Sequence, residues 1–313
     1  MKFIYAVFFI LLLPGLVSCN GNSRKKLAQE APLISKSYTD GLGRSVQLAR
    51  APQRVVSIAP NITEIMYAIG ASDKLIAGSE ACDFPAATDT LPRLVTYPSL
   101  DLEQIQFFKP DLILTTDEIF TPDQIERIEA MGTPVFVQSY QSLDDVFDNM
   151  RELGEVLGKK EQANHVADSL KALVERIAAK TDNEVKFGTL IFISDNPLKV
   201  VGGKGVLHNL IGLAGGENAM GKFEDPYPEV TSEAILQAKP EVIIFPSNDE
   251  QIYANLLAEF PWLSNTPADV NKRIFIMDPD LLYRPGPRMV TGLLQLTQSL
   301  HSGLTADKFL ERE

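Results

Sequence analysis

Apolar residues are spaced along the chain in two ways, and the two alternate. One is a short unbroken run rich in Val, Ile and Leu, which predicts a buried strand. Strands of this kind are predicted in the first half at residues 55–59, 75–77, 112–115 and 135–137. The other spacing recurs every three or four residues, as on one face of a helix. It first occurs with Asn61 as an expected helix cap and Glu64 as an expected first-turn acid, and it ends at Gly70. Strand and helix in alternation predict an α/β fold with a parallel sheet.

The middle of the chain is predicted to be helical throughout. Apolar residues keep the helical spacing from Leu143 as far as Gly158, and a second predicted helix covers residues 161–180 without Gly or Pro. At 1.5 Å per residue this second helix would be roughly 30 Å long, so we expect it to join two lobes rigidly. The second half is expected to hold strands at residues 190–193 and 200–201 and helices at residues 206–213 and 289–300.

One stretch of the chain occurs twice. It reads TYPSLDLEQIQFFKPDLIL at residues 96–114 and PYPEVTSEAILQAKPEVII at residues 226–244, an offset of 130 residues without gaps. The identical pairs are Tyr97 with Tyr227, Pro98 with Pro228, Glu103 with Glu233, Ile105 with Ile235, Lys109 with Lys239, Pro110 with Pro240 and Ile113 with Ile243. About one identity is expected by chance in so short a stretch. The repeat therefore indicates an internal duplication, whose period suits two similar lobes.

Each copy combines an aromatic loop with an acid at a helix start. Tyr97 and Tyr227 precede a predicted helix. Glu103 and Glu233 fall in its first turn, where the positive end of the helix dipole favours a carboxylate. One interpretation is local: a solvated acid and a common helix-to-strand joint. The other is functional: two aromatic loops facing across a cleft could hold a flat apolar ligand, and two acids on the rim could meet two basic groups of a partner.

The first residues have the pattern of an export signal. A positively charged start precedes an apolar stretch at residues 3–13, too short to cross a bilayer, and the sequence LVSC ending at Cys19 resembles a bacterial lipoprotein cleavage site. We expect residues 1–18 to be a signal peptide, Cys19 to carry lipid, and residues 19–34 to be a flexible tether. An ordinary signal peptide or a membrane helix with an incidental cysteine is the alternative. If Cys19 carries lipid, Cys82 has no disulfide partner. Cys82 is expected to be a small buried residue, with a thiol that reaches a ligand in the cleft as the alternative.

Composition and charge narrow the function. The chain has 313 residues, enough for two domains, and 45% of them are hydrophobic. A formal net charge of -12 argues against a nucleic-acid partner, because such proteins gather Lys and Arg on one face. The three histidines, His165, His208 and His301, lack a second ligand at zinc-site spacing, so no metal site is expected. The GGKG segment at residues 202–205 lacks the spacing of a phosphate-binding loop, and no motif of a catalytic nucleophile is present.

Several segments together are similar to one known family. They are RVVSIAPNITEIMYAIGASDKLIAG, LDLEQIQFFKPDLIL, VTSEAILQAKPEVIIF and RPGPRMV, and the similarity covers about residues 52–302. The chain resembles the substrate-binding proteins of ABC importers with a single rigid connecting helix, which serve cobalamin, haem and ferric siderophores. Within that family it is most similar to the cobalamin-binding members.

The resemblance implies a non-enzymatic protein with a defined architecture. Two similar Rossmann-like α/β lobes with short parallel sheets would be joined by one long helix, with the ligand cleft between the lobes. The implied division is an N-terminal lobe at residues 35–158, a linking helix at residues 159–182 and a C-terminal lobe at residues 183–313. The implied ligand is cobalamin or a related corrinoid, with no cofactor.

The resemblance also implies which residues meet the ligand and the partner. The matching ligand-binding positions are Tyr97, Tyr227, Phe84, Asp280 and Arg284. Glu103 and Glu233 match the family's two acids that dock on the permease. The implied partner is an ABC permease and ATPase complex, and the protein is expected to be a monomer anchored by lipid in the periplasm or cell envelope.

Departures from the cobalamin-binding pattern leave other ligands open. Ala81 stands where those members carry an aromatic residue, the rings at Tyr97 and Tyr227 are smaller than Trp, and the segment DPDLLYR follows the pattern loosely. A ferric siderophore or haem is the alternative within the same class of transporter. A metallochelatase with its site in the cleft is the alternative from a different class.

Overall fold

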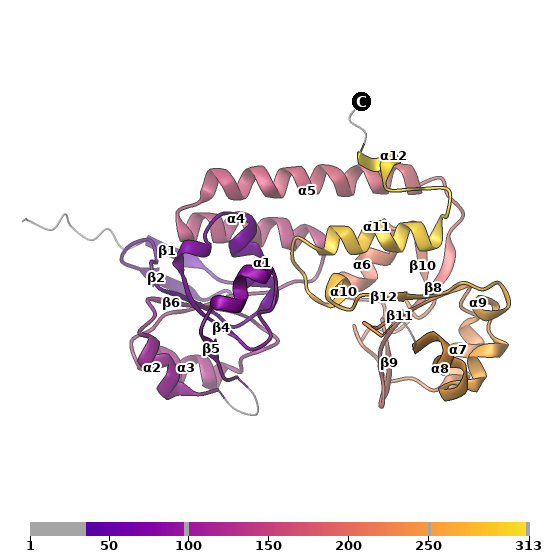
Figure 1. Ribbon diagram of the computed structural model, residues 1–313, viewed down its shortest axis with the longest axis horizontal. Coiled ribbons are helices and arrows are strands. Elements are labelled where there is room, and N and C mark those ends of the chain that lie inside the picture. Colours follow the sequence, from indigo (N-terminus) through magenta and orange to yellow (C-terminus); the bar gives the residue numbers. More distant parts are fainter. Residues whose placement is uncertain (1–35, 97–99, 250–251, 311–313) are drawn as a thin grey trace, which may run out of the picture. The chain divides into compact units, whose positions relative to one another are not determined.

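Two five-stranded sheets organise the chain (Figure 1). The computed structural model describes residues 36–96, 100–249 and 252–310, which belong to one unit of contacts, Ser35–Glu313. An antiparallel hairpin of β1 (Lys36–Thr39) and β2 (Ser45–Leu48) precedes the first sheet. In the described part of the chain, no helix is both long enough and apolar enough to span a membrane.

The first sheet is parallel throughout and has the strand order β5-β4-β3-β6-β7. Its strands are β3 (Val55–Ser57), β4 (Leu75–Ser79), β5 (Arg93–Leu94), β6 (Leu112–Thr116) and β7 (Val135–Gln138). Its connecting segments are α1 (Pro60–Ala68), the 3-10 turns η1 (Ser72–Lys74) and η2 (Ala86–Thr90), α2 (Leu102–Phe108) and α3 (Pro122–Ala130). The strands predicted from unbroken apolar runs are confirmed, because those runs are buried on both faces of this sheet.

The second sheet has the order β10-β8-β11-β12, with β9 added antiparallel to β8. Its strands are β8 (Phe187–Asp195), β9 (Leu198–Val200), β10 (Gly216–Asn218), β11 (Val242–Pro246) and β12 (Ile274–Met277). The helical segments are α6 (Val206–Leu213), α7 (Ser232–Ala238), α8 (Ile252–Glu259), η3 (Pro261–Asn265), α9 (Pro267–Val270), α10 (Asp280–Tyr283), α11 (Met289–Leu300) and α12 (Asp307–Leu310). Together the two sheets confirm the predicted α/β class.

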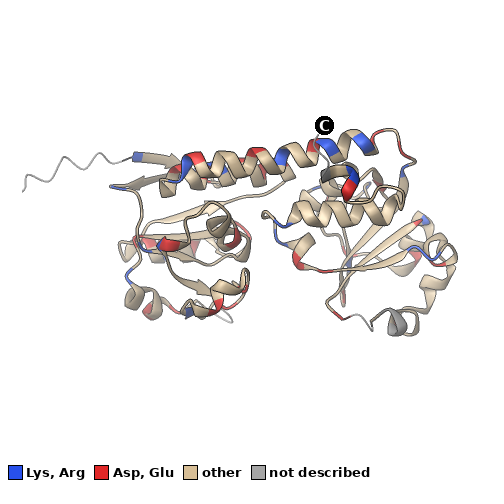
Figure 2. Ribbon diagram, turned by 45° about the horizontal axis from the view of Figure 1, so that its top comes forward, with Lys and Arg blue, Asp and Glu red and all other residues tan. Residues whose placement is uncertain are grey.

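Two long helices connect the sheets. Helix α4 (Leu143–Leu157) ends at Gly158 in a left-handed conformation, and α5 (Lys160–Thr181) follows at once. The pair packs closely, since a Cβ added at Gly154 would lie 2.2 Å from the Cβ of Ala163. Charged residues of both signs follow α5 along its length (Figure 2). The helix predicted over residues 161–180 is present as α5.

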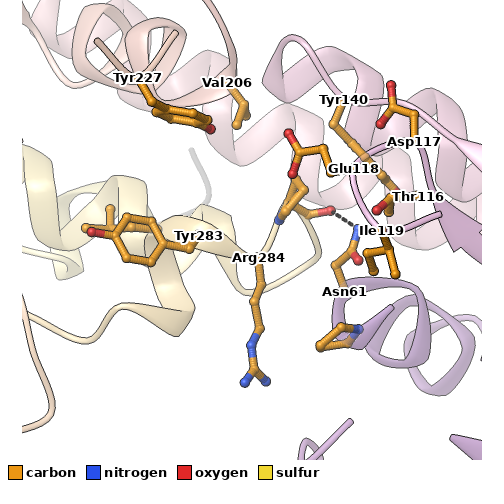
Figure 3. Close-up of a pocket in the computed structure, with 13 residues that line it drawn as sticks. Asn61, Thr116, Asp117, Glu118, Ile119, Tyr140, Val206, Tyr227, Tyr283 and Arg284 are labelled. Atoms are coloured by element: carbon orange, nitrogen blue, oxygen red, sulfur yellow. Dashed lines mark hydrogen bonds between the residues drawn. The ribbon is translucent and has the colours of Figure 1, made fainter. Parts of the chain in front are cut away.

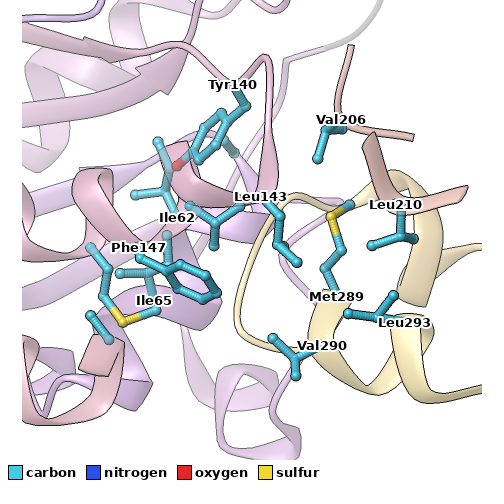
Figure 4. Packing of buried hydrophobic residues seen from close by; sticks show 14 of the residues in the cluster. Ile62, Ile65, Tyr140, Leu143, Phe147, Val206, Leu210, Met289, Val290 and Leu293 are labelled. Carbon is cyan, nitrogen blue, oxygen red and sulfur yellow. The ribbon is translucent and has the colours of Figure 1, made fainter. Parts of the chain in front are cut away.

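The largest buried cluster belongs to both halves of the chain (Figure 4). It includes Ile65 and Phe147 from the first half together with Leu210 and Leu293 from the second half. Next to it the backbone N–H of Leu143 donates a hydrogen bond of 3.0 Å to the side-chain oxygen of Asn209. The halves are therefore joined by shared packing as well as by α5.

Each half also has a core of its own. One surrounds Ile113 of β6 and the other surrounds Ile243 of β11, an identical pair of the repeat. The duplicated unit therefore supplies the same strand to the private core of each half.

Candidate functional site

A cavity of about 180 Å³ lies between the two halves, where the carboxyl ends of β3 and β6 face a segment that follows β12 (Figure 3). The first half contributes residues at the ends of those two strands together with Tyr140, which follows β7. The second half contributes Val206, Tyr227 and residues 282–285. Open α/β sheets bind ligands at the carboxyl ends of their strands, because the chain leaves the sheet there and its loops can diverge. The position therefore makes this cavity the candidate ligand site.

Two tyrosines give the cavity an aromatic wall. The loop that carries Tyr227 is held by its backbone N–H, which donates to Asp225 Oδ1 at 2.8 Å. The Tyr283 hydroxyl donates to the backbone oxygen of Phe192 at 2.7 Å, and the ring stays 39% exposed. Burial raises the pKa of both phenols, with a smaller contribution from the Glu118 carboxylate at Tyr227. Both hydroxyls therefore stay protonated near neutral pH, and both rings can contact an apolar ligand face.

A cluster of charged side chains lies at the edge of the cavity. Glu64 of α1 is 3% exposed; its Oε1 accepts from Arg288 at 2.6 Å and lies 3.7 Å from Arg284 Nη1. Arg284, which lines the cavity, also pairs with Asp280 at 3.0 Å and with Asp83. Burial raises the pKa of Glu64, and its bond to Arg288 opposes that rise. The cluster ties the first half to the second at the cavity.

The sequence interpretation of the α1 start is wrong. The helix begins at Pro60, and the preceding residue Ala59 makes no side-chain cap. Asn61 lies inside the helix, and its amide nitrogen donates to the backbone oxygen of Pro285 at 3.2 Å (Figure 3). Pro60 is a suitable first helical residue, so the helix starts before Asn61. Asn61 and Glu64 are buried polar residues that pair with the second half.

The predicted ligand residues fall at different distances from the cavity. Tyr227 and Arg284 line it, whereas Asp280 and Phe84 do not. Asp280 lies in the charged cluster beside the cavity. The ring of Phe84 is 41% exposed and lies 4.0 Å from the guanidinium carbon of Arg288, which holds it next to that cluster. Tyr97 lies outside the described residues, as does Cys19.

Glu103 and Glu233 both occupy first turns, of α2 and α7, and both side chains are exposed. Asp101 caps α2 and accepts the N–H of Glu103 at 3.0 Å, and Thr231 caps α7. Hydrogen bonding at the helix start lowers the pKa of Glu233. Neither acid lines the cavity.

Cys82 is fully buried, as predicted. Its sulfur accepts a hydrogen bond of 3.1 Å from the hydroxyl of Thr63. Within residues 36–96, 100–249 and 252–310, no three or more His, Cys, Asp and Glu residues are grouped so that they could hold a metal ion.

Several cavity residues were not expected from the sequence. They are Asn61, Thr116, Asp117, Glu118, Ile119 and Tyr140, whereas Tyr283 lies in the stretch from Asp280 to Arg284 that was expected to approach the ligand. One available signal was position, because Thr116 to Ile119 come directly at the end of a predicted buried strand. Tyr140 carried no such signal: it comes two residues after β7, and its hydroxyl donates to Gln138 at 2.6 Å within the core.

Comparison with known proteins gives consistent results. The model of the periplasmic binding protein family matches residues 55–281. A protein of Vibrio vulnificus named vitamin B12-binding protein is 32% identical over 259 residues, which is 82% of this chain and 94% of that relative. The crystal structure of the periplasmic vitamin B12-binding protein of Vibrio cholerae is 26% identical, with a TM-score of 0.72 over 80% of this chain and 97% of that one. A periplasmic haem-binding protein from Pseudomonas aeruginosa is 25% identical, with a TM-score of 0.72 over 81% of this chain and 94% of that one.

Proposed function

This chain belongs to the periplasmic binding protein family, and on that premise we propose that it binds a corrinoid such as cobalamin in the cavity between its halves and delivers it to an ABC permease. Membership confirms the family resemblance seen in the sequence and the prediction of a solute-binding protein rather than an enzyme. It also implies a periplasmic location.

One observation carries the choice of ligand site. The cavity joins two tyrosine rings from the second half to polar side chains from the first half, so a bound molecule contacts both halves at once. A corrinoid ring is broad and has an apolar face, which suits contact with Tyr227 and Tyr283. It is larger than the cavity of about 180 Å³, so the cavity would form the floor of the site. Tyr97, Phe84, Asp280 and Arg284 are proposed to surround the rest of the ligand.

The choice of cobalamin follows the relatives. Proteins named for vitamin B12 binding match 82% of this chain at 32% identity. Haem is the second candidate, because a haem-binding protein of 25% identity has the same fold at a TM-score of 0.72. A ferric siderophore stays a third possibility within the same class of transporter.

The delivery step and the anchor complete the proposal. Glu103 and Glu233 are proposed to dock on the permease, because both are exposed acids at matching positions of the two copies. Cys19 is proposed to carry the lipid anchor, with residues 1–18 as the signal peptide and residues 19–34 as the tether. The monomer would then have lobes at residues 35–158 and 183–313, joined by the helix within residues 159–182.

The test is calorimetric titration of the purified protein with cyanocobalamin. We expect one ligand per chain with a Kd below about 1 μM, and a Kd about tenfold higher for Tyr227→Ala. The matched control is Phe107→Ala, which removes an exposed ring outside the cavity and should leave the Kd unchanged. Binding of haemin or a ferric hydroxamate with no binding of cyanocobalamin would contradict the corrinoid assignment.

A further inference from the structure

Two adjacent carboxylates form one side of the candidate cavity. Asp117 and Glu118 follow β6 directly and both line the cavity. Figure 3 shows the Glu118 carboxylate on the side of the cavity that faces Tyr227. The same proximity contributes to the raised pKa of the Tyr227 phenol. Glu118 therefore faces the space between the halves.

These carboxylates have no basic partner in the described part of the chain. No ion pair or side-chain hydrogen bond joins either of them to Lys, Arg or His among residues 36–96, 100–249 and 252–310. Burial raises the pKa of Glu118, and the neighbouring Asp117 raises it further. When these carboxylates are ionised, no basic side chain of the described residues neutralises their charge.

The opposite side of the cavity does not supply a free cation. Arg284 is the only basic side chain among the described residues that line it. It is already surrounded by Asp83, Asp280 at 3.0 Å and Glu64 at 3.7 Å, while Arg288 bonds Glu64 at 2.6 Å. Three carboxylates thus face two guanidinium groups, and the cluster has no positive charge to spare for an anionic ligand.

We propose that Glu118, with Asp117, makes this cavity selective for a neutral or cationic ligand rich in N–H donors, and against one that presents carboxylates there. This deepens the proposed function and rests on it. An amide or hydroxyl of the ligand can donate to Glu118, and such charge-assisted bonds are the stronger kind. A carboxylate at the same place would be repelled by a like charge with little water between them.

This selectivity separates the candidate ligands by chemistry. The periphery of cobalamin carries neutral carboxamides, whereas haem carries two propionate groups that are ionised at neutral pH. The acidic side of the cavity therefore favours the corrinoid over haem and over iron chelates with free carboxylates.

The experiment uses pairs of ligands that differ only in whether carboxyl groups are free or masked. One pair is cyanocobalamin and its monocarboxylic acids, made by hydrolysing one propionamide; the other is haemin dimethyl ester and haemin. For at least one acid isomer of the first pair, we expect the wild-type protein to bind the neutral member at least about tenfold more tightly than the acid. Glu118→Gln should lower the affinity for the neutral member and raise that for the acid, so that their ratio falls by about tenfold. The control Glu175→Gln removes a carboxylate from exposed α5, outside the cavity, and should leave the ratio as in wild type.

The outcomes separate this proposal from the proposed function. Absence of corrinoid binding would contradict the proposed function, and the haemin pair would then decide the charge preference. Equal binding of neutral and acidic members by wild type, or a ratio unaffected by Glu118→Gln, would overturn the charge preference even if cyanocobalamin binds. Binding of neither pair would overturn both.

Discussion

Helices α2 in the first half and α7 in the second half are copies of one unit, and their backbones are alike. Each is followed by a lysine in the left-handed conformation, Lys109 with φ 48° and Lys239 with φ 49°. The acid after the next proline then accepts a backbone N–H of the neighbouring segment, as Asp111 does from Arg54 at 2.8 Å and Glu241 from Gly188 at 2.9 Å. The end of the helix and the tie from the following segment to the neighbouring strand region are therefore the same in both copies.

The two copies differ where they face outward or towards the cavity. On the outer face, Phe107 of α2 is 80% exposed, and Gln237 is its counterpart in α7. Towards the cavity, the acidic pair Asp117 and Glu118 corresponds to Ser247 and Asn248. The comparison teaches that the duplicated scaffold constrains the backbone and keeps the first-turn acids Glu103 and Glu233, whereas other outward-facing positions and the residues after the strand have diverged.

The largest expected effect comes from breaking the charged tie between the halves. Glu64→Ala would leave Arg288 without its main partner in a largely buried place, so we expect the free energy of unfolding to fall by about 3 kcal/mol. Chemical denaturation measures it. The second half ties back through Asn209 by a hydrogen bond to the Leu143 N–H, so Asn209→Ala should cost only about 1 kcal/mol. Equal losses in the two variants would contradict the greater weight given to the Glu64 cluster.

The next effect tests whether the two exposed acids act as a pair. Glu103→Ala combined with Glu233→Ala should lower cobalamin uptake by about tenfold or more, because rim charges govern docking on an oppositely charged partner. Uptake is measured in the native host deleted for this chain and supplied with each variant, and calorimetry of the purified variants should give the wild-type Kd. Glu175→Ala, an exposed acid on α5, is the control. A double variant with normal uptake would remove both acids from the docking surface.

The local elements could be predicted from the sequence because local patterns determine them. Unbroken apolar runs gave β3, β4, β6 and β7, and the helix predicted at residues 289–300 is α11, Met289–Leu300. Buried strands and amphipathic helices need only neighbouring residues to be recognised. The internal repeat and the long helix indicated two lobes, and the family resemblance added the cleft between them.

The cavity was harder to predict because it depends on contacts between distant residues. Glu64 was assigned to a helix start because its local sequence resembles one, yet its partner Arg288 is 224 residues away. Likewise, Glu118 and Tyr227 line the same cavity only because the two halves face each other there. Side chains that act through such contacts carry no local signal.

A smaller effect tests whether the two helix ends are equivalent. Left-handed backbone is unfavourable for lysine and easy for glycine, so Lys109→Gly and Lys239→Gly should each raise the free energy of unfolding by up to about 1 kcal/mol. Lys109→Ala and Lys239→Ala remove the charge but keep a Cβ, and they should not stabilise. Thermal and chemical denaturation report the change. A gain in one copy and a loss in the other would show that the two ends are not equivalent.

The smallest effect concerns the outer faces, where the copies differ most plainly. Phe107 lies four residues after Glu103 and therefore on the same face of α2, so a partner that meets the acid also covers the ring. Phe107→Gln makes this face resemble that of α7; it should change the free energy of unfolding by less than about 0.5 kcal/mol, because the ring is exposed. Uptake should fall by about threefold, since the apolar area covered on docking is lost. Adding Gln237→Phe transfers the ring to the second copy, and recovery of uptake would mean that the partner presents two equivalent sites. Unchanged uptake in the single variant would limit the docking surface to the acids.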